Sequence, residues 1–169
     1  YKLVEAFDAL NMSQFCDRQL EIFSYGCGAA TDTCSLISYC RSKQINLPFK
    51  NLTLIEPSKI AVNKGVEYIE EALSNEEFDN INIKKIYKTL QHLKENDLDS
   101  ESKISKLHVF SDVLDIQEIN LDDLASLINK TQSGTNYFLC INPKNSESKS
   151  RIDNFYNKLS KLFELSDIS

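Results

Sequence analysis

The stretch LEIFSYGCGAA, residues 20–30, decides how this chain is expected to fold. Its apolar run reaches Tyr25 and stops at a turn that contains Gly26 and Gly28. From Thr31 onward, apolar residues recur at the spacing of a helix. The stretch therefore predicts a strand, a glycine turn and a helix, which is the unit that begins a doubly wound α/β sheet.

A second strand and a second helix are predicted directly after the first pair. Residues 52–55 (LTLI) form the continuous apolar run typical of a strand that is buried on both faces of a parallel sheet. The run ends at Glu56, and Ser58 is a predicted N-cap for a helix that carries Val62 and Ile69 on its apolar face. Alternating strands and helices of this kind predict a parallel sheet with right-handed crossovers.

The alternation continues in the second half of the chain. Residues 107–111 (LHVFS) and 137–141 (YFLCI) are predicted strands, and each precedes an amphipathic helix. Residues 80–93 fit a strand by alternation and a helix by periodicity; the architecture favours a strand, and both readings stay open at this point. The polar residues 94–103 are expected to form a loop.

Together these elements predict an α/β fold in a single domain over residues 1–169. A leading helix is expected within residues 1–18, and an α/β core within residues 19–169. The core is expected to be a doubly wound, mostly parallel sheet of about five or more strands with helices on both faces.

The composition narrows the class of protein. Hydrophobic residues make up 41% and charged residues 26%, as in soluble globular chains, and no run of about 18 apolar residues offers a membrane span. The formal net charge of −6 means that this segment alone does not indicate nucleic-acid binding. Because the chain has neither an initiating Met nor a signal-peptide pattern, we expect a cytoplasmic protein that is part of a longer polypeptide.

The cysteines predict neither a disulfide framework nor a metal centre. Their number is five, which is odd, and no pair has CxxC spacing. Only His92 and His108 are available to complete a cluster of metal ligands. We expect the cysteines to be small buried apolar side chains and the protein to hold no metal.

The glycine turn and Glu56 are expected to lie together, because the carboxyl ends of neighbouring parallel strands meet at one edge of the sheet. A carboxylate at this place can accept both hydroxyls of a ribose. A dinucleotide fingerprint needs a third glycine where this chain has Thr31, which makes a nicotinamide-dependent oxidoreductase the less favoured alternative. The pattern G-x-G-x-G is matched more closely, since only its last glycine is replaced, by Ala30.

Three motifs resemble those of class I S-adenosylmethionine-dependent methyltransferases. Residues 20–30 are similar to the first motif, and residues 54–58 (LIEPS) are similar to the second, whose acid holds the ribose of the cofactor. Residues 110–114 (FSDVL) are similar to the motif that follows the fourth strand and lies beneath the cofactor. The chain departs from the family at Ser24, where an acid is usual, and at Asp112, where Asn is common.

The resemblance implies a Rossmann-like methyltransferase fold, truncated because the last two strands of the family are not visible in the sequence. It also implies methyl transfer from S-adenosylmethionine to a nitrogen, oxygen or carbon nucleophile of an unidentified substrate. No catalytic residue is implied, because the cofactor carries the reactive group. The residues implied to bind the cofactor are Tyr25, Gly26, Gly28, Ala30, Glu56 and Asp112. The alternative is a domain of this fold that has lost catalysis and acts as a ligand-sensing or protein-interaction module.

Overall fold

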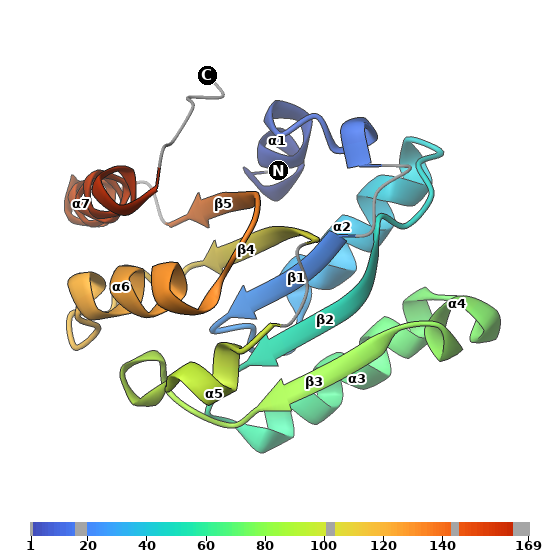
Figure 1. Ribbon diagram of the computed structural model, residues 1–169. Coiled ribbons are helices and arrows are strands. Elements are labelled where there is room, and N and C mark those ends of the chain that lie inside the picture. Colours follow the sequence, from blue (N-terminus) through green and yellow to red (C-terminus); the bar gives the residue numbers. More distant parts are fainter. Residues whose placement is uncertain (1, 16–19, 101–103, 143–145, 164–169) are drawn as a thin grey trace.

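The computed structural model describes residues 2–15, 20–100, 104–142 and 146–163. Five strands form one parallel sheet in the order β3-β2-β1-β4-β5 (Figure 1). The strands are β1 (Leu20–Tyr25), β2 (Phe49–Ile55), β3 (Asn82–Ile86), β4 (Ser105–Ser111) and β5 (Asn136–Ile141). The strand order reverses between β1 and β4, which is the topological switch point of a doubly wound sheet.

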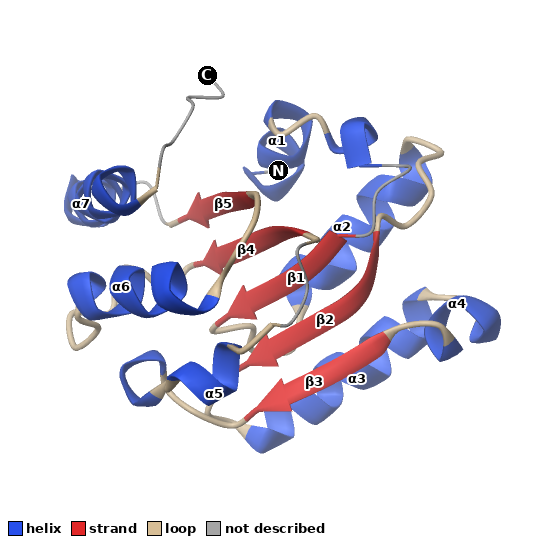
Figure 2. Ribbon diagram, in the orientation of Figure 1, coloured by secondary structure: helices blue, strands red, loops and turns tan. Residues whose placement is uncertain are grey.

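Helices cover both faces of the sheet, as Figure 2 shows. The helices α1, α2 and α3 pack on one face, and α6 and α7 pack on the other. The helical segments are α1 (Lys2–Ala9), η1 (Met12–Phe15), α2 (Thr31–Ser42), α3 (Lys59–Ala72), α4 (Asn75–Asp79), η2 (Leu90–His92), α5 (Glu95–Leu98), α6 (Leu121–Thr131) and α7 (Ser146–Leu162). The predicted Rossmann-like α/β class is therefore confirmed.

Alternating residues of each strand divide the core into two layers. Ile22 and Leu52 lie in the layer beneath α2 and α3, whereas Phe23 and Phe110 lie in the layer beneath α6 and α7. This division follows from the two-residue period of a strand, which sends successive side chains to opposite faces. Among the described residues, no helix is long and apolar enough to cross a membrane.

Several predicted boundaries change in the structure. The leading helix is shorter than expected, because Asn11 takes a positive φ of 49° and separates α1 from the turn η1. The favoured strand within residues 80–93 is confirmed as β3, and η2 follows it. The expected loop at 94–103 was partly wrong, since it contains the one-turn helix α5. Residues 16–18 of the predicted leading helix and residue 19 of the predicted core lie outside the described part of the chain.

His108 is held inside an aromatic layer on the α6 side of the sheet. Its ring lies between those of Phe23 and Phe138, with centroids 5.3 and 4.9 Å away. The Asn136 amide donates to Gly134 O, so its oxygen faces His108 Nε2 at 2.9 Å and accepts a hydrogen bond from the Nε2–H. The Tyr25 hydroxyl therefore donates to His108 Nδ1, at 3.0 Å. These bonds fix a neutral imidazole with a structural role.

Burial lowers the pKa of His108 to about 4, and this shift predicts a loss of stability in acid. Between the unfolded pKa of 6.5 and about 4, only the unfolded chain binds the proton, so lowering the pH favours unfolding. We expect this residue to remove about 2 kcal/mol from the free energy of unfolding between pH 7 and pH 5. Urea titrations of the native chain and of His108→Gln at both pH values measure it. Equal pH dependence of the two proteins would contradict the assignment.

Candidate functional site

The bend between β1 and α2 is fixed by backbone hydrogen bonds to the neighbouring strand. The amides of Gly26 and Cys27 both donate to Ile55 O, at 2.8 and 3.1 Å. Gly26 and Gly28 take positive φ angles of 65° and 51°, in the left-handed region that glycine adopts without a steric penalty. The two glycines therefore let the chain turn sharply at the carboxyl edge of the sheet, as the sequence predicts.

Glu56 lies at this bend. Its Oε2 accepts from the amide of Gly28 at 3.3 Å, and its Oε1 accepts from the amide of Ser58 at 3.1 Å. The side chain is partly buried. Because a carboxylate oxygen can accept two hydrogen bonds, each oxygen keeps capacity for one further donor. The structure thus brings together the glycine bend and the acid, which was the central expectation from the sequence.

The two glycines of the bend have different surroundings. A methyl group built on Gly26 would lie 2.6 Å from Val113 Cγ2, so a buried side chain from the loop after β4 covers this residue. A methyl group built on Gly28 would meet nothing within 4 Å. The open part of the bend is therefore at Gly28, next to Glu56, and the part that faces β4 is closed by Val113.

Ala30 stands at the position of the last glycine in the G-x-G-x-G pattern. It nevertheless takes the left-handed backbone conformation that glycine favours. It takes a φ of 56°, and its amide donates to Cys27 O at 2.7 Å. Its side chain is fully buried, close to Gly65 of α3. A methyl group on Gly65 would lie 2.8 Å from the carbonyl carbon of Ala29 and 2.9 Å from Ala30 Cβ. Gly65, which the sequence analysis did not single out, therefore makes room for the bend; a glycine inside an amphipathic helix was the available signal.

A buried carboxylate contacts Ser24. The Ser24 hydroxyl donates to Asp32 Oδ2 at 2.5 Å, and the amide of Thr33 donates to Asp32 Oδ1 at 2.7 Å. Asp32 comes from the first turn of α2 and is 6% exposed. Burial raises the pKa of Asp32, while these donors oppose that rise. A carboxylate of α2 thus lies beside the position in β1 where the sequence resemblance leads us to expect an acid.

Tyr25 and Asp112 contribute differently from the other candidate residues. The Tyr25 ring points into the core, where it stacks on Phe110 with a centroid distance of 4.3 Å. Only the backbone of Tyr25 reaches the bend. Asp112 begins the loop after β4 with a φ of 54°, and its amide donates to Ile141 O at 2.7 Å. Its side chain is exposed, and no hydrogen bond links it to Glu56 within the described residues.

The Cys27 thiol lies in the bend but is not prepared for nucleophilic chemistry. Burial raises its pKa to about 12, with smaller contributions from the negative charges of Asp32 and Glu56. A thiol with such a pKa stays protonated at neutral pH. No group of three or more His, Cys, Asp or Glu within the described ranges is placed to hold a metal ion.

Arg151 of α7 organises the loop that follows Asp112. Its guanidinium donates to Leu114 O at 2.5 Å, and one of its amino groups donates to Ile116 O at 2.9 Å and to Ile119 O at 3.0 Å. One side chain thus ties three carbonyls of this loop to the last described helix. The role of Arg151 was not predicted from the sequence. The sequence shows an arginine in a predicted helix, but it does not show which loop that arginine contacts.

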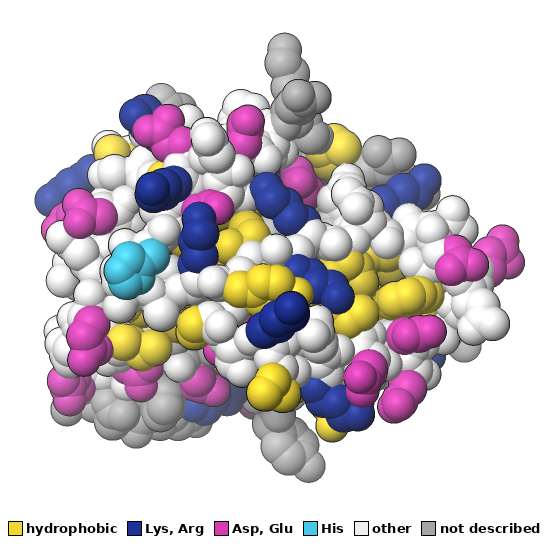
Figure 3. Space-filling view, turned by 90° about the horizontal axis from the view of Figure 1, so that it is seen from below, with side chains coloured by type: hydrophobic (Ala, Val, Ile, Leu, Met, Phe, Trp, Pro, Cys, Tyr) yellow, Lys and Arg dark blue, Asp and Glu magenta, His cyan; other side chains and the backbone are white. Residues whose placement is uncertain are grey.

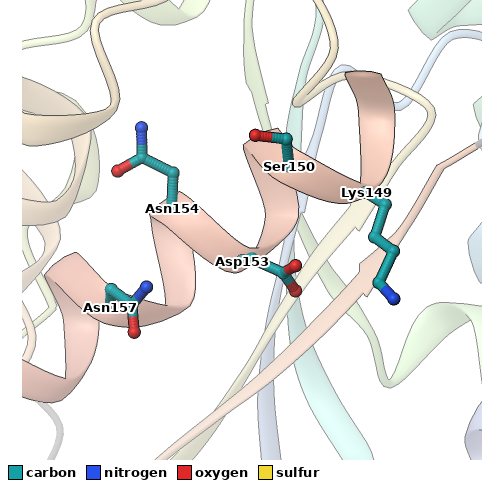
Figure 4. Close-up of a pocket in the computed structure, with 5 residues that line it drawn as sticks. All are labelled: Lys149, Ser150, Asp153, Asn154 and Asn157. Carbon is teal, nitrogen blue, oxygen red and sulfur yellow. The ribbon is translucent and has the colours of Figure 1, made fainter. Parts of the chain in front are cut away.

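Two shallow hollows lie away from Glu56. Figure 4 shows the first, of about 450 Å³, whose lining residues all come from α7. They are Lys149, Ser150, Asp153, Asn154 and Asn157. The second hollow, also of about 450 Å³, lies along α2 beside Val4 of α1 and includes Thr31. Neither contains a residue predicted to bind the cofactor.

Comparison with protein-family models and with curated proteins finds no match to this chain. Among solved structures, the chain is similar to the methyltransferase domain of bacterial CtHen1. The two share 9% sequence identity with a TM-score of 0.46. The match covers 76% of this chain and 58% of the other, so it spans less than two thirds of that protein's chain.

Proposed function

We propose that the bend at residues 26–30 binds S-adenosylmethionine and that the domain transfers its methyl group to a nitrogen, oxygen or carbon nucleophile. The observation that supports this most is the position of Glu56. Its Oε2 accepts from the Gly28 amide on the open side of the bend, its Oε1 accepts from the Ser58 amide, and each oxygen can still accept one hydrogen bond. A ribose offers two neighbouring hydroxyls to such a carboxylate.

The residues present fit this cofactor at Glu56 and Gly28. The space beside the Gly28 Cα allows a ligand to approach the backbone closely. The charge at the bend also fits, because the carboxyl groups of Asp32 and Glu56 both lie beside it. A negative potential favours the sulfonium and ammonium groups of S-adenosylmethionine and disfavours the pyrophosphate of a dinucleotide.

In this proposal the protein binds and aligns, while the cofactor supplies an electrophilic methyl group when bound. Glu56 holds the ribose, and the Asp32–Ser24 pair keeps the first turn of α2 against β1. Arg151 fixes the loop after Asp112, over which a methyl acceptor would dock at the switch point. Holding the acceptor in line with the methyl group provides the rate enhancement.

A second candidate is a ligand-binding domain without catalysis. Two observations favour it: Val113 covers Gly26, and the Asp32 carboxylate is occupied by Ser24 and Thr33. Both reduce the part of the bend that is open to the methionine portion of a cofactor. This candidate predicts that S-adenosylhomocysteine binds but that no radiolabelled methyl group is transferred to protein, nucleic acid or small molecules.

Glu56→Gln is expected to abolish cofactor binding with little effect on folding, because an amide replaces one of the two acceptor oxygens. For the native chain at a ligand concentration of about one hundred times Kd, the melting temperature should rise by roughly 5–10 °C. We expect this rise with S-adenosylmethionine and with S-adenosylhomocysteine, and not with NAD. Thermal denaturation of both proteins with each ligand measures it.

Glu70→Gln is the matched control, since Glu70 is an exposed residue of α3 and the change in charge is the same. It should keep the full rise in melting temperature. A rise that persists in Glu56→Gln, or one that NAD produces equally, would refute the proposed site. Binding of S-adenosylhomocysteine without methyl transfer would support the second candidate.

A further inference from the structure

Lysine and tyrosine side chains that are distant in the sequence gather on one side of the molecule, over α3 and the edge strand β3. We call this surface the lysine–tyrosine face and define it by Lys59, Asn63, Lys64, Tyr68, Lys85 and Tyr87. Figure 3 views the molecule from the side of β3, and basic and hydrophobic side chains alternate across its centre. Such mixing of basic and aromatic groups is typical of surfaces that bind nucleic acid.

The alternation of side chains along β3 and the residue after it places Lys85 and Tyr87 on the face. Ile83 packs with the core layer beneath α3, so Lys85 and Tyr87 project to the same side. Asn63 lies between them and α3, and its side-chain oxygen accepts from Lys85 Nζ and from the Tyr87 hydroxyl, each at 3.5 Å. Strand and helix thus present one continuous surface.

The two tyrosines are exposed and each has an ammonium group beside its ring. Tyr68 is 42% exposed and Tyr87 is 40% exposed. Lys64 Nζ lies 4.8 Å from the ring centroid of Tyr68, and Lys59 Nζ lies 5.9 Å from that of Tyr87. A base stacked on either ring would therefore carry its phosphates close to a lysine.

Two of the three lysines on the face have no direct acidic partner in the described part of the chain, whereas Glu67 and Glu71 of α3 both act on the third, Lys64. Lys64 forms an ion pair with Glu67, at 2.7 Å. Neither Lys59 nor Lys85 has a carboxylate within ion-pair distance among the described residues. Two positive charges on this face are therefore not neutralised by direct ion pairs, although the whole chain has a formal net charge of −6.

We propose that the lysine–tyrosine face binds single-stranded nucleic acid. Lys59, Lys64 and Lys85 contact phosphates, and the rings of Tyr68 and Tyr87 stack on bases. The stacking favours a single strand over a duplex, since the faces of paired bases are covered by their neighbours. It also favours nucleic acid over an acidic peptide, which would use the lysines but leave the rings unstacked. No sequence pattern predicts this surface, because Lys59 and Lys85 are far apart along the chain.

Fluorescence anisotropy of a labelled 20-nucleotide (dT) oligomer, titrated with the 169-residue chain in low salt and without S-adenosylmethionine, tests the proposal. The double variant Lys59→Glu/Lys85→Glu should weaken binding at least tenfold. Its matched control, Lys149→Glu/Lys161→Glu, reverses two exposed charges of α7 and should change binding less than twofold. The slope of log affinity against log salt should decrease in magnitude by about 0.7 for each lysine lost from the face.

Tyr68→Leu/Tyr87→Leu separates stacking from charge, and it should weaken binding at least fivefold. Since the chain has no Trp, its tyrosine emission reports base stacking, and the oligomer should quench it in the native chain more than in this variant. The circular dichroism spectra of all variants should match that of the native chain.

Three outcomes would overturn the proposal: equal losses of affinity in the two charge-reversed proteins, equal competition by a duplex or by polyglutamate, or undetectable binding. Because no cofactor is present in this experiment, these outcomes neither support nor contradict the proposed cofactor site.

Discussion

Gly65→Ala is expected to lower the free energy of unfolding by about 3 kcal/mol, although the same change inside most helices is stabilising by about 1 kcal/mol. The new methyl group would lie 2.8 Å from the carbonyl carbon of Ala29 and 2.9 Å from Ala30 Cβ. The Ala29 atom belongs to the backbone, and Ala30 is held by its bond to Cys27 O. The clash can be relieved only by moving α3 or the bend.

Urea unfolding of the variant and the native chain measures this effect. Glu70→Ala is a control in the same helix, at an exposed position where alanine should be neutral or slightly stabilising. If Gly65→Ala is as stable as the native chain, the close packing of α3 against residues 29–30 does not exist. If the proposed cofactor site is correct, the displaced bend should also reduce the rise in melting temperature with S-adenosylmethionine.

The sheet could be predicted from the sequence because continuous apolar runs mark strands at its centre and at its β5 edge. Residues 52–55 and 137–141 were recognised in this way, and both lie inside β2 and β5. The start of β2 was missed, because its first three residues, FKN, are not continuously apolar and are held by pairing with β1. The short helix α4 was also missed, since it depends on the capping box of Ser74 and Glu77.

The candidate site was predictable only where topology determines position. Parallel strands bring Glu56 to the bend whatever the surrounding side chains are, so that contact could be anticipated. The Asp32 contact with Ser24 depends on how α2 packs, and the Val113 contact with Gly26 depends on the path of an irregular loop. Neither arrangement leaves a pattern in a single sequence. Strand alternation explains the direction of the Tyr25 ring in the layer beneath α6 and α7, but from the sequence Tyr25 was included only among the residues implied to bind the cofactor.

Gly26→Ala is expected to lower the free energy of unfolding by about 3–4 kcal/mol, because two unfavourable effects add. The φ of 65° costs about 1–2 kcal/mol for a residue with a side chain. The added methyl group would also lie 2.6 Å from Cγ2 of Val113, which is a buried side chain. Urea unfolding at pH 7 measures the change.

Gly28→Ala is the matched control for this prediction. Its φ of 51° carries a similar backbone penalty, but a methyl group there meets nothing within 4 Å. We therefore expect a loss of about 1–2 kcal/mol.

In the double variant Gly26→Ala/Val113→Ala, the loss should be smaller than the sum of the single losses, since the clashing methyl groups of Val113 are gone. Equal losses for Gly26→Ala and Gly28→Ala would show that backbone conformation alone acts and that Val113 does not close the bend. Gly28→Ala should nevertheless weaken the response to S-adenosylmethionine, because its methyl group would occupy the open side of the bend beside Glu56.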